Sequence, residues 1–325
     1  MGLNINQNKE RGNRKDMADK KKSAEKKTLK SLISKIAGII VVLILAYFTA
    51  DQTGVIQTGN DSTETNGETL EVHYIDVGQG DSIFIKCGGE TMLIDAGERD
   101  YGDVVTNYIK THSDGTKLDI VVATHPHSDH IGGMAEVLEN MGGVKTLIVP
   151  KIVDQYVPTT KTYEKFLKTV GNLGMTLTPA KVGNTYSLGA AKIEILSPAK
   201  DNYGDDMNNY SVVTKLTFGD NSFLFTGDAE KEVEEEMINN GVLTDIDVLK
   251  AGHHGSNTSS SQAFLDVVKP EYVVIQCGAG NSYGHPHEEP MQRFSALTDK
   301  IYRTDLQGSI VITSDGHSLN VSCEK

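Results

Sequence analysis

The densest group of side chains that could carry out chemistry lies at residues 124–133, which read THPHSDHIGG. Three imidazoles and one carboxylate, from His125, His127, Asp129 and His130, fall within six residues. Imidazole nitrogens and carboxylate oxygens bind borderline divalent cations such as zinc and manganese. Alternate residues of an extended loop point the same way, so His125 and His127 can hold one ion. Asp129 and His130 then turn towards a second ion, so the segment predicts a centre of two metal ions.

An apolar, β-branched run at 118–123 precedes this segment and predicts a buried strand. Gly132 and Gly133 let the chain turn into a helix predicted from Met134 to about Asn140. The candidate ligands therefore lie on a strand-to-helix loop, at the carboxyl end of a strand, where α/β folds keep their sites. The alternative interpretation is a histidine-rich surface loop, which the dense spacing and the similar groups downstream disfavour.

Further candidate groups also follow apolar runs. Asp95 ends the run MLID, and Asp228 ends the run FLFTGD. His253 and His254 follow a third predicted strand, and His285 lies after a fourth. Carboxylates at the ends of buried strands rarely lack a role, because burying a charge without a partner is costly. We therefore expect Asp95 and Asp228 to have a role, whereas the residue types alone fit His285 equally well as a histidine of a surface loop.

The segment 125–130 has the pattern His-x-His-x-Asp-His, the signature of the metallo-β-lactamase fold, which residues 69–325 resemble. The phrases DVGQGDS at 76–82, TGD at 226–228 and KAGHHGS at 250–256 narrow the resemblance. They are similar to the extracytoplasmic hydrolase domain of ComEC-type DNA-uptake proteins, and also to teichoic-acid phosphorylcholine esterases. The resemblance implies an α/β fold built as a four-layer αββα sandwich.

The resemblance also implies roles for particular side chains. Asp95 would hold the metal loop by hydrogen bonds, and Asp228 would bridge the two ions. His254 is the preferred ligand of the second ion and His253 would face the substrate, although the sequence leaves this choice open. His285 would be a donor to a phosphate or a general acid. The implied metal ligands are His125, His127, Asp129, His130, Asp228 and His254, and the implied catalytic residues are Asp129, His253 and His285.

The chain departs from the family pattern in one respect. The family has another histidine ligand before the bridging aspartate, but residues 131–227 contain no histidine. The first ion would then have three protein ligands and an open position, which describes a catalytic site. Asn209, Ser211 and Tyr283 are the predicted substrate contacts. An open, Lewis-acidic ion favours a tetrahedral phosphoryl centre over a β-lactam carbonyl.

The amino-terminal part of the chain is organised differently. Residues 1–35 hold 11 of the 31 Lys and Arg residues and 4 of the 44 Asp and Glu residues, and predict a disordered, basic tail. Residues 36–50 carry no charge and predict a single transmembrane helix, with a cleaved signal peptide as the alternative. Residues 51–68 predict a flexible linker. Positive charge before the span predicts a cytoplasmic amino terminus and an extracellular hydrolase domain, 69–325.

Composition limits the function classes. The chain after the basic tail has a net charge of about −20, which argues against a broad nucleic-acid-binding surface. No dinucleotide cofactor is expected, and the three cysteines predict buried thiols, with one disulfide as an alternative. The leading hypothesis is a membrane-anchored phosphodiesterase that uses two divalent ions, zinc or manganese, with DNA as a candidate substrate. The alternatives are a phosphoesterase acting on a wall polymer or small phosphoester, and a non-catalytic metal-binding module.

Overall fold

The computed structural model describes residues 64–113 and 118–325, which fall within one compact unit. The predicted tail and membrane span, 1–35 and 36–50, lie outside the described residues, as does most of the predicted linker. Within the described part of the chain, no helix has both the length and the apolar character that crossing a bilayer requires.

The described residues form two β-sheets. The first has eight strands in the order β15-β14-β1-β2-β3-β4-β5-β6, of which β3 to β6 run parallel. Its strands are β1 (Leu70–Tyr74), β2 (Ile83–Cys87), β3 (Glu90–Ile94), β4 (Leu118–Val122), β5 (Val144–Val149), β6 (Leu177–Pro179), β14 (Ile310–Ser314) and β15 (Leu319–Cys323).

The second sheet has seven described strands in the order β13-β12-β11-β10-β9-β8-β7, of which β10 to β13 run parallel. Its strands are β7 (Thr185–Leu188), β8 (Ala191–Ser197), β9 (Val213–Phe218), β10 (Asn221–Phe225), β11 (Val248–Lys250), β12 (Tyr272–Ile275) and β13 (Ile301–Arg303).

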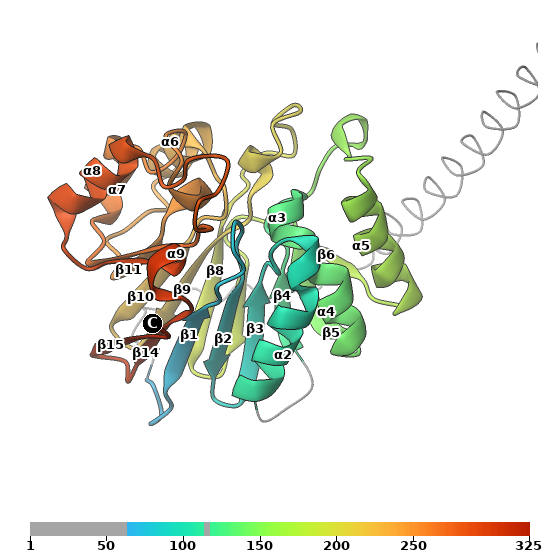
Figure 1. Cartoon of the computed structure of the whole chain (residues 1–325), viewed down its shortest axis with the longest axis horizontal. Helices are drawn as coiled ribbons and strands as arrows, with labels where there is room; N and C mark the ends of the chain where they lie inside the picture. Colours follow the sequence, from blue (N-terminus) through green and yellow to red (C-terminus); the bar gives the residue numbers. More distant parts are fainter. Residues whose placement is uncertain (1–63, 114–117) are drawn as a thin grey trace, which may run out of the picture. The chain divides into compact units, whose positions relative to one another are not determined.

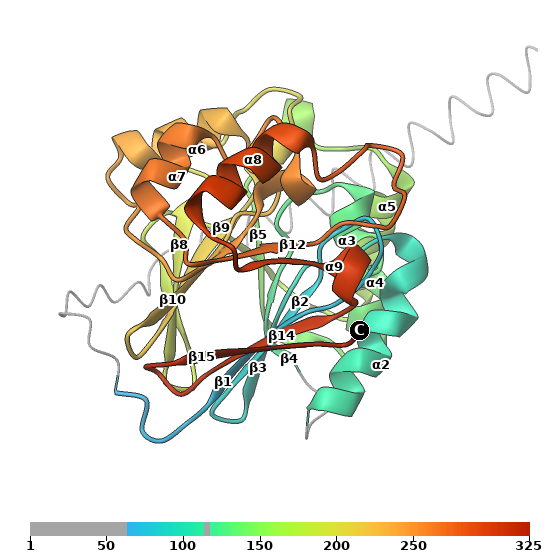
Figure 2. The ribbon, with the colours of Figure 1, turned by 60° about the vertical axis from the view of Figure 1, so that its left-hand side comes forward.

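Helices cover the outer face of each sheet (Figures 1 and 2). The helices α2 (Gly102–His112), α4 (Met134–Asn140) and α5 (Lys161–Asn172) pack on the first sheet. The helices α6 (Lys231–Asn239), α7 (Gln262–Val268) and α8 (Glu288–Leu297) pack on the second. The predicted four-layer αββα sandwich is therefore confirmed. The short helices α3 (Ser128–Ile131) and α9 (Thr304–Gln307) lie in loops.

Three apolar cores hold the described layers together. The central core joins the two sheets and contains Val72, Ile85, Phe218 and Phe225. The other two cores lie between each sheet and its helices. The inner strands are therefore buried on both faces, which explains why they read as continuous apolar runs rather than alternating ones.

The strands β6 and β7 have no counterpart among the sequence-predicted elements. Each is short and lies at the edge of its sheet, and β6 ends in Pro179. An edge strand buries few side chains and carries little hydrophobic pattern, so local sequence gives a weak signal. The three cysteines are free thiols; Cys87 and Cys277 are buried, and Cys323 is partly exposed.

Candidate metal centre

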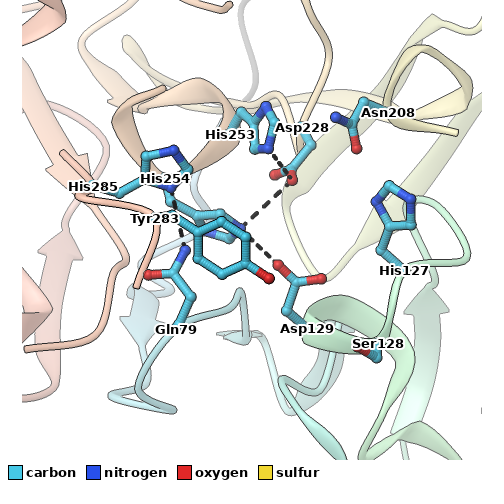
Figure 3. Close-up of a pocket in the computed structure, with 10 residues that line it drawn as sticks. All are labelled: Gln79, His127, Ser128, Asp129, Asn208, Asp228, His253, His254, Tyr283 and His285. Atoms are coloured by element: carbon cyan, nitrogen blue, oxygen red, sulfur yellow. Dashed lines mark hydrogen bonds and ion pairs between the residues drawn. The ribbon is translucent and has the colours of Figure 1, made fainter. Parts of the chain in front are cut away.

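The loops that leave the carboxyl ends of the parallel strands meet at one end of the sandwich. They enclose an open pocket of about 250 Å³ together with the β1–β2 loop. Figure 3 shows the residues that line it, with His127 and Asp129 on one side and His253 and His254 on the other. The lining residues are Gln79, His127, Ser128, Asp129, Asn208, Asp228, His253, His254, Tyr283 and His285.

The loop after β4 brings two imidazoles together at the first predicted ion. His125 Nε2 lies 3.0 Å from His127 Nδ1, and 3.8 Å from Asp228 Oδ2. Burial lowers the pKa of both histidines, so both are neutral near pH 7 and present a lone pair. Neutral imidazole is the form that binds metal.

A second group of donors also surrounds the Asp228 carboxylate. His130 Nε2 lies 3.2 Å from Asp228 Oδ1, and His254 Nε2 lies 3.5 Å from Asp228 Oδ2. Asp129 Oδ2 is 3.3 Å from His254 Nε2 and 3.9 Å from His130 Nε2. Ligands about 2.0–2.1 Å from a tetrahedral ion stand about 3.3 Å apart, so this spacing fits one cation.

Hydrogen bonds fix which nitrogen of each imidazole faces the centre. Asp95 Oδ2 lies 2.7 Å from His130 Nδ1, and its two oxygens also accept from the backbone N–H and hydroxyl of Thr124. His254 Nδ1 donates to the Gln276 carbonyl oxygen at 2.9 Å. In each ring Nδ1 carries the proton, so Nε2 presents its lone pair to the centre.

The buried polar atoms here fit a bound cation. His130 Nε2, His254 Nε2 and Asp228 Oδ1 make no hydrogen bond to any described residue. Burial alone would lower the pKa of His254, but Asp228 and Asp81 outweigh it and raise that pKa to about 9. For His130, the nearby carboxylates raise the pKa well above its usual range in the same way. The negative electrostatic potential of these carboxylates favours a proton on each of the two imidazoles. The same potential favours a divalent cation in place of those protons.

The comparisons with known proteins agree with this geometry. The family model "Metallo-beta-lactamase superfamily" matches residues 75–279, which is more than half of the chain. The chain belongs to the metallo-beta-lactamase superfamily. Members of this superfamily are metal-dependent hydrolases, and Asp81, His130, Asp228 and His254 form a buried group whose spacing fits a metal ion.

Three curated relatives show which members of the superfamily this chain resembles. ComE operon protein 3 of Bacillus subtilis is 33% identical over 257 residues, covering 74% of this chain and 32% of that protein. Recombination protein 2 of Haemophilus influenzae is 29% identical over 247 residues, covering 74% and 28%. Competence protein ComA of Neisseria gonorrhoeae is 31% identical over 238 residues, covering 72% and 31%. The resemblance to ComEC-type proteins is thus confirmed, and the chain spans about a third of their length.

The local backbone distinguishes the two adjacent histidines of this superfamily member. His253 and His254 both adopt left-handed conformations, with φ of 49° and 54°, so their side chains diverge from a tight turn after β11. His253 Nε2 and His254 Nε2 both lie 3.5 Å from Asp228 Oδ2. His254 is buried and its Nδ1 is held by the Gln276 carbonyl oxygen, whereas His253 is partly exposed in the pocket with Nδ1 3.3 Å from Glu230. This arrangement favours His254 as the ligand and leaves His253 facing the substrate space.

A buried ion pair behind the ligands was missed by the sequence reasoning. Lys250 Nζ lies 2.7 Å from Asp81 Oδ2 and donates to the Ala251 carbonyl oxygen, and neither charged side chain is appreciably exposed. Asp81 Oδ1 lies 3.2 Å from His254 Nδ1, the ring nitrogen on the far side from Asp228. Asp81 is close enough to be counted with the metal ligands, but its position behind the ring makes it a support for His254.

The close approach of two loops explains a glycine in the DVGQGDS phrase. Gly80 has a φ of 149°, and a Cβ there would lie 2.3 Å from the Asp129 carbonyl oxygen. That oxygen accepts a hydrogen bond from the Asp81 backbone N–H at 3.1 Å. The β1–β2 loop is therefore bound directly beneath the metal loop, and only glycine fits at this contact.

The predicted substrate contacts are placed differently from one another. Tyr283 lines the pocket, 64% exposed, with its ring stacked on His285. Asn209 and Ser211 are instead buried behind the wall: Asn209 bonds Asp206 and the Glu230 N–H, and Ser211 accepts from the Asp228 N–H.

Asn208, rather than the predicted Asn209, lines the pocket. A short 3₁₀ turn, Asn208–Tyr210, directs the two neighbouring side chains differently. Asn208 Nδ2 donates to Glu230 Oε1 at 3.1 Å, and Figure 3 shows its side chain between Asp228 and His127. The side-chain oxygen of Asn208, Oδ1, is buried without a hydrogen-bond partner among the described residues. Asn208 is therefore the better candidate for contact with a substrate.

Proposed function

We propose that this chain is a membrane-anchored, extracytoplasmic, metal-dependent phosphodiesterase. The observation that carries the proposal is the arrangement of donors around the Asp228 carboxylate, which lies near both His125 and His254. His125 and His127 form one group, and no histidine from residues 131–227 adds to them. A metal with three protein donors keeps a position for water or substrate, and two ions that share a carboxylate suit in-line attack at phosphorus.

The lining residues have roles consistent with that reaction. Bound divalent ions would supply a hydroxide at neutral pH and offset the charge on the phosphoryl oxygens. Asp129 stays ionised because His130 and His254 offset its burial and lower its pKa, so it can accept a hydrogen bond from the attacking water. Burial, together with His254 and His253, lowers the pKa of His285 to about 4. His285 is then neutral at pH 7 and suits a hydrogen-bond donor better than a cationic general acid.

The relatives direct the choice of substrate. Two of them are named for competence and recombination, which makes DNA the first phosphodiester to test. The acidic charge of the body disfavours a broad electrostatic track along a nucleic acid. Recognition would therefore rest on the pocket itself, and single strands or ends fit an opening of this size better than a duplex does.

The activity test uses the full chain, purified in mild detergent and loaded with zinc or manganese. We expect turnover of bis-(p-nitrophenyl) phosphate and of single-stranded DNA to exceed that of a cephalosporin by far, and chelation to abolish it. Hydrolysis of a phosphoester bond in a wall teichoic acid, without DNA cleavage, would transfer the assignment to the alternative phosphoesterase. Faster turnover of a β-lactam or lactone than of any phosphodiester would refute the proposal, and an inert, metal-loaded chain would indicate a binding module.

The proposed location rests on the charge step across residues 36–50. Eleven positive residues precede this uncharged segment, and no Lys or Arg follows it before Lys86. Protease added to intact cells should therefore digest the hydrolase domain and spare the tail, as followed by tags at the two ends. A domain that is degraded only after lysis would contradict the outward orientation.

A further inference from the structure

The β1–β2 loop places Gln79 in the pocket wall beside His285. Gln79 Oε1 accepts a hydrogen bond from the Gly278 backbone N–H at 3.2 Å, so the orientation of the side-chain amide is fixed. Its other end, Nε2, lies 3.4 Å from His285 Nδ1 (Figure 3). An amide nitrogen can only donate, so His285 Nδ1 must accept and the ring proton must be on Nε2.

The surroundings of His285 keep its ring in this orientation. Its backbone N–H donates to Asn281 Oδ1 at 3.0 Å, and its carbonyl oxygen accepts from Asn281 Nδ2 at 2.6 Å. The ring packs edge-on against His253 and stacks on Tyr283, with centroids 5.5 Å and 5.7 Å away. With Nδ1 taken by Gln79, the Nε2–H is the donor that this ring offers to a ligand in the pocket.

Gln79 is itself held firmly. A Cβ at Gly278 would lie 2.7 Å from the Gln79 backbone nitrogen, so the two loops touch main chain to main chain. Such contact fixes the Gln79 main chain, and the hydrogen bond from the Gly278 N–H to Oε1 holds the side-chain amide in one orientation. The hydrogen bonds therefore form one directed series, from the Gly278 N–H through Gln79 to His285.

We propose that Gln79 is a positioning residue that holds His285 in the Nε2–H tautomer, so that the neutral imidazole donates to an anionic phosphoryl oxygen. The assignment of a phosphoryl oxygen rests on the proposed function, whereas the tautomer follows from the protein alone. Gln79 contacts no reacting atom in this scheme and acts through His285. Its loss should slow turnover more than it weakens substrate binding, because the donated hydrogen bond strengthens as charge develops.

The kinetic test replaces Gln79 with methionine, which has a similar shape and no amide. Gln79→Met should lower kcat by about tenfold to a hundredfold, the range for losing one hydrogen bond to a charged group, with KM nearly unchanged and both ions bound. In a His285→Ala background the same substitution should have no further effect. An equal loss in both backgrounds would overturn the proposal. Gln292→Met, at an exposed glutamine on α8, is the matched control and should behave as wild type.

A spectroscopic test separates this proposal from the proposed function. In the zinc-loaded full chain, ¹⁵N NMR of His285 should show a proton on Nε2 and a bare Nδ1. Gln79→Glu keeps the acceptor for the Gly278 N–H but cannot donate, so it should put a proton on Nδ1. A wild-type ring protonated on Nδ1, or a tautomer unchanged in Gln79→Glu, would refute the role of Gln79 whatever the substrate is. If the tautomers are as expected but the protein has no phosphodiesterase activity, the role of Gln79 in positioning His285 stands and only the proposed phosphodiesterase reaction is refuted.

Discussion

Asp228→Asn should remove nearly all activity and the shared binding of two ions. Asp228 Oδ1 faces His130, and Asp228 Oδ2 faces His125 and His254, so one carboxylate serves both groups of donors. Asparagine lacks the charge and replaces one oxygen by an N–H donor, which cannot bind a cation. Loss of a single oxyanion-hole donor costs about 10²–10³ in kcat, and we expect a larger fall for a shared ligand.

The measurement pairs metal analysis with turnover of bis-(p-nitrophenyl) phosphate by the same preparation. Asp220→Asn is the matched control, because Asp220 also lies beside an imidazole, His317, at 2.7 Å. Both of those side chains are more than three-quarters exposed, so the control should retain two ions and full activity. Two tightly bound ions and undiminished turnover in Asp228→Asn would exclude Asp228 as the bridging ligand.

Lys250→Met should destabilise the metal-free chain by about 3–5 kcal/mol, the usual loss when one partner of a buried ion pair is removed. Lys250 and Asp81 are both fully buried, and Lys250 and His254 together lower the pKa of Asp81 although burial raises it. Without the ammonium group, the buried Asp81 carboxylate loses its closest cationic partner and keeps only His254 Nδ1 beside it, at 3.2 Å. The double variant Asp81→Asn with Lys250→Met should recover much of the lost unfolding free energy, because neither buried charge remains.

Urea unfolding followed by circular dichroism measures this effect, since the chain has no tryptophan to report by fluorescence. Lys269→Met is the matched control: Lys269 pairs with Asp245 at 3.5 Å, but both side chains are more than 60% exposed. We expect a change of less than about 0.5 kcal/mol there. An unfolding free energy for Lys250→Met within about 1 kcal/mol of wild type would show that the buried pair contributes little.

Much of the fold, and the grouping of the candidate ligands in one region, could be predicted because their signals are local. The inner strands are buried on both faces, so apolar runs marked them, and the spacing of His125, His127 and His130 in one loop indicated their shared role. The edge strands β6 and β7 bury too little to leave such a pattern.

The supports behind the ligands could not be predicted, because they depend on tertiary contacts. Asp81 and Lys250 come from different sheets and meet only when the sandwich closes. Gln79 likewise reaches His285 from the opposite half of the chain. Asn208 and Asn209 were indistinguishable in sequence, since the choice between them depends on one turn of 3₁₀ helix. The phrases DVGQGDS and KAGHHGS contain Gln79, Asp81 and Lys250, but the sequence did not indicate which residues they contact.

The position of the donors across both sheets has a consequence for how the protein matures. His125 to His130 follow a strand of the first sheet, whereas Asp228 and His254 follow strands of the second, far later in the chain. A nascent chain therefore carries only part of the donor set until its carboxyl-terminal half has been made and docked. Metal loading would then be a late step, carried out in the compartment where folding finishes, and the supply of ions there would decide which metal the mature protein carries.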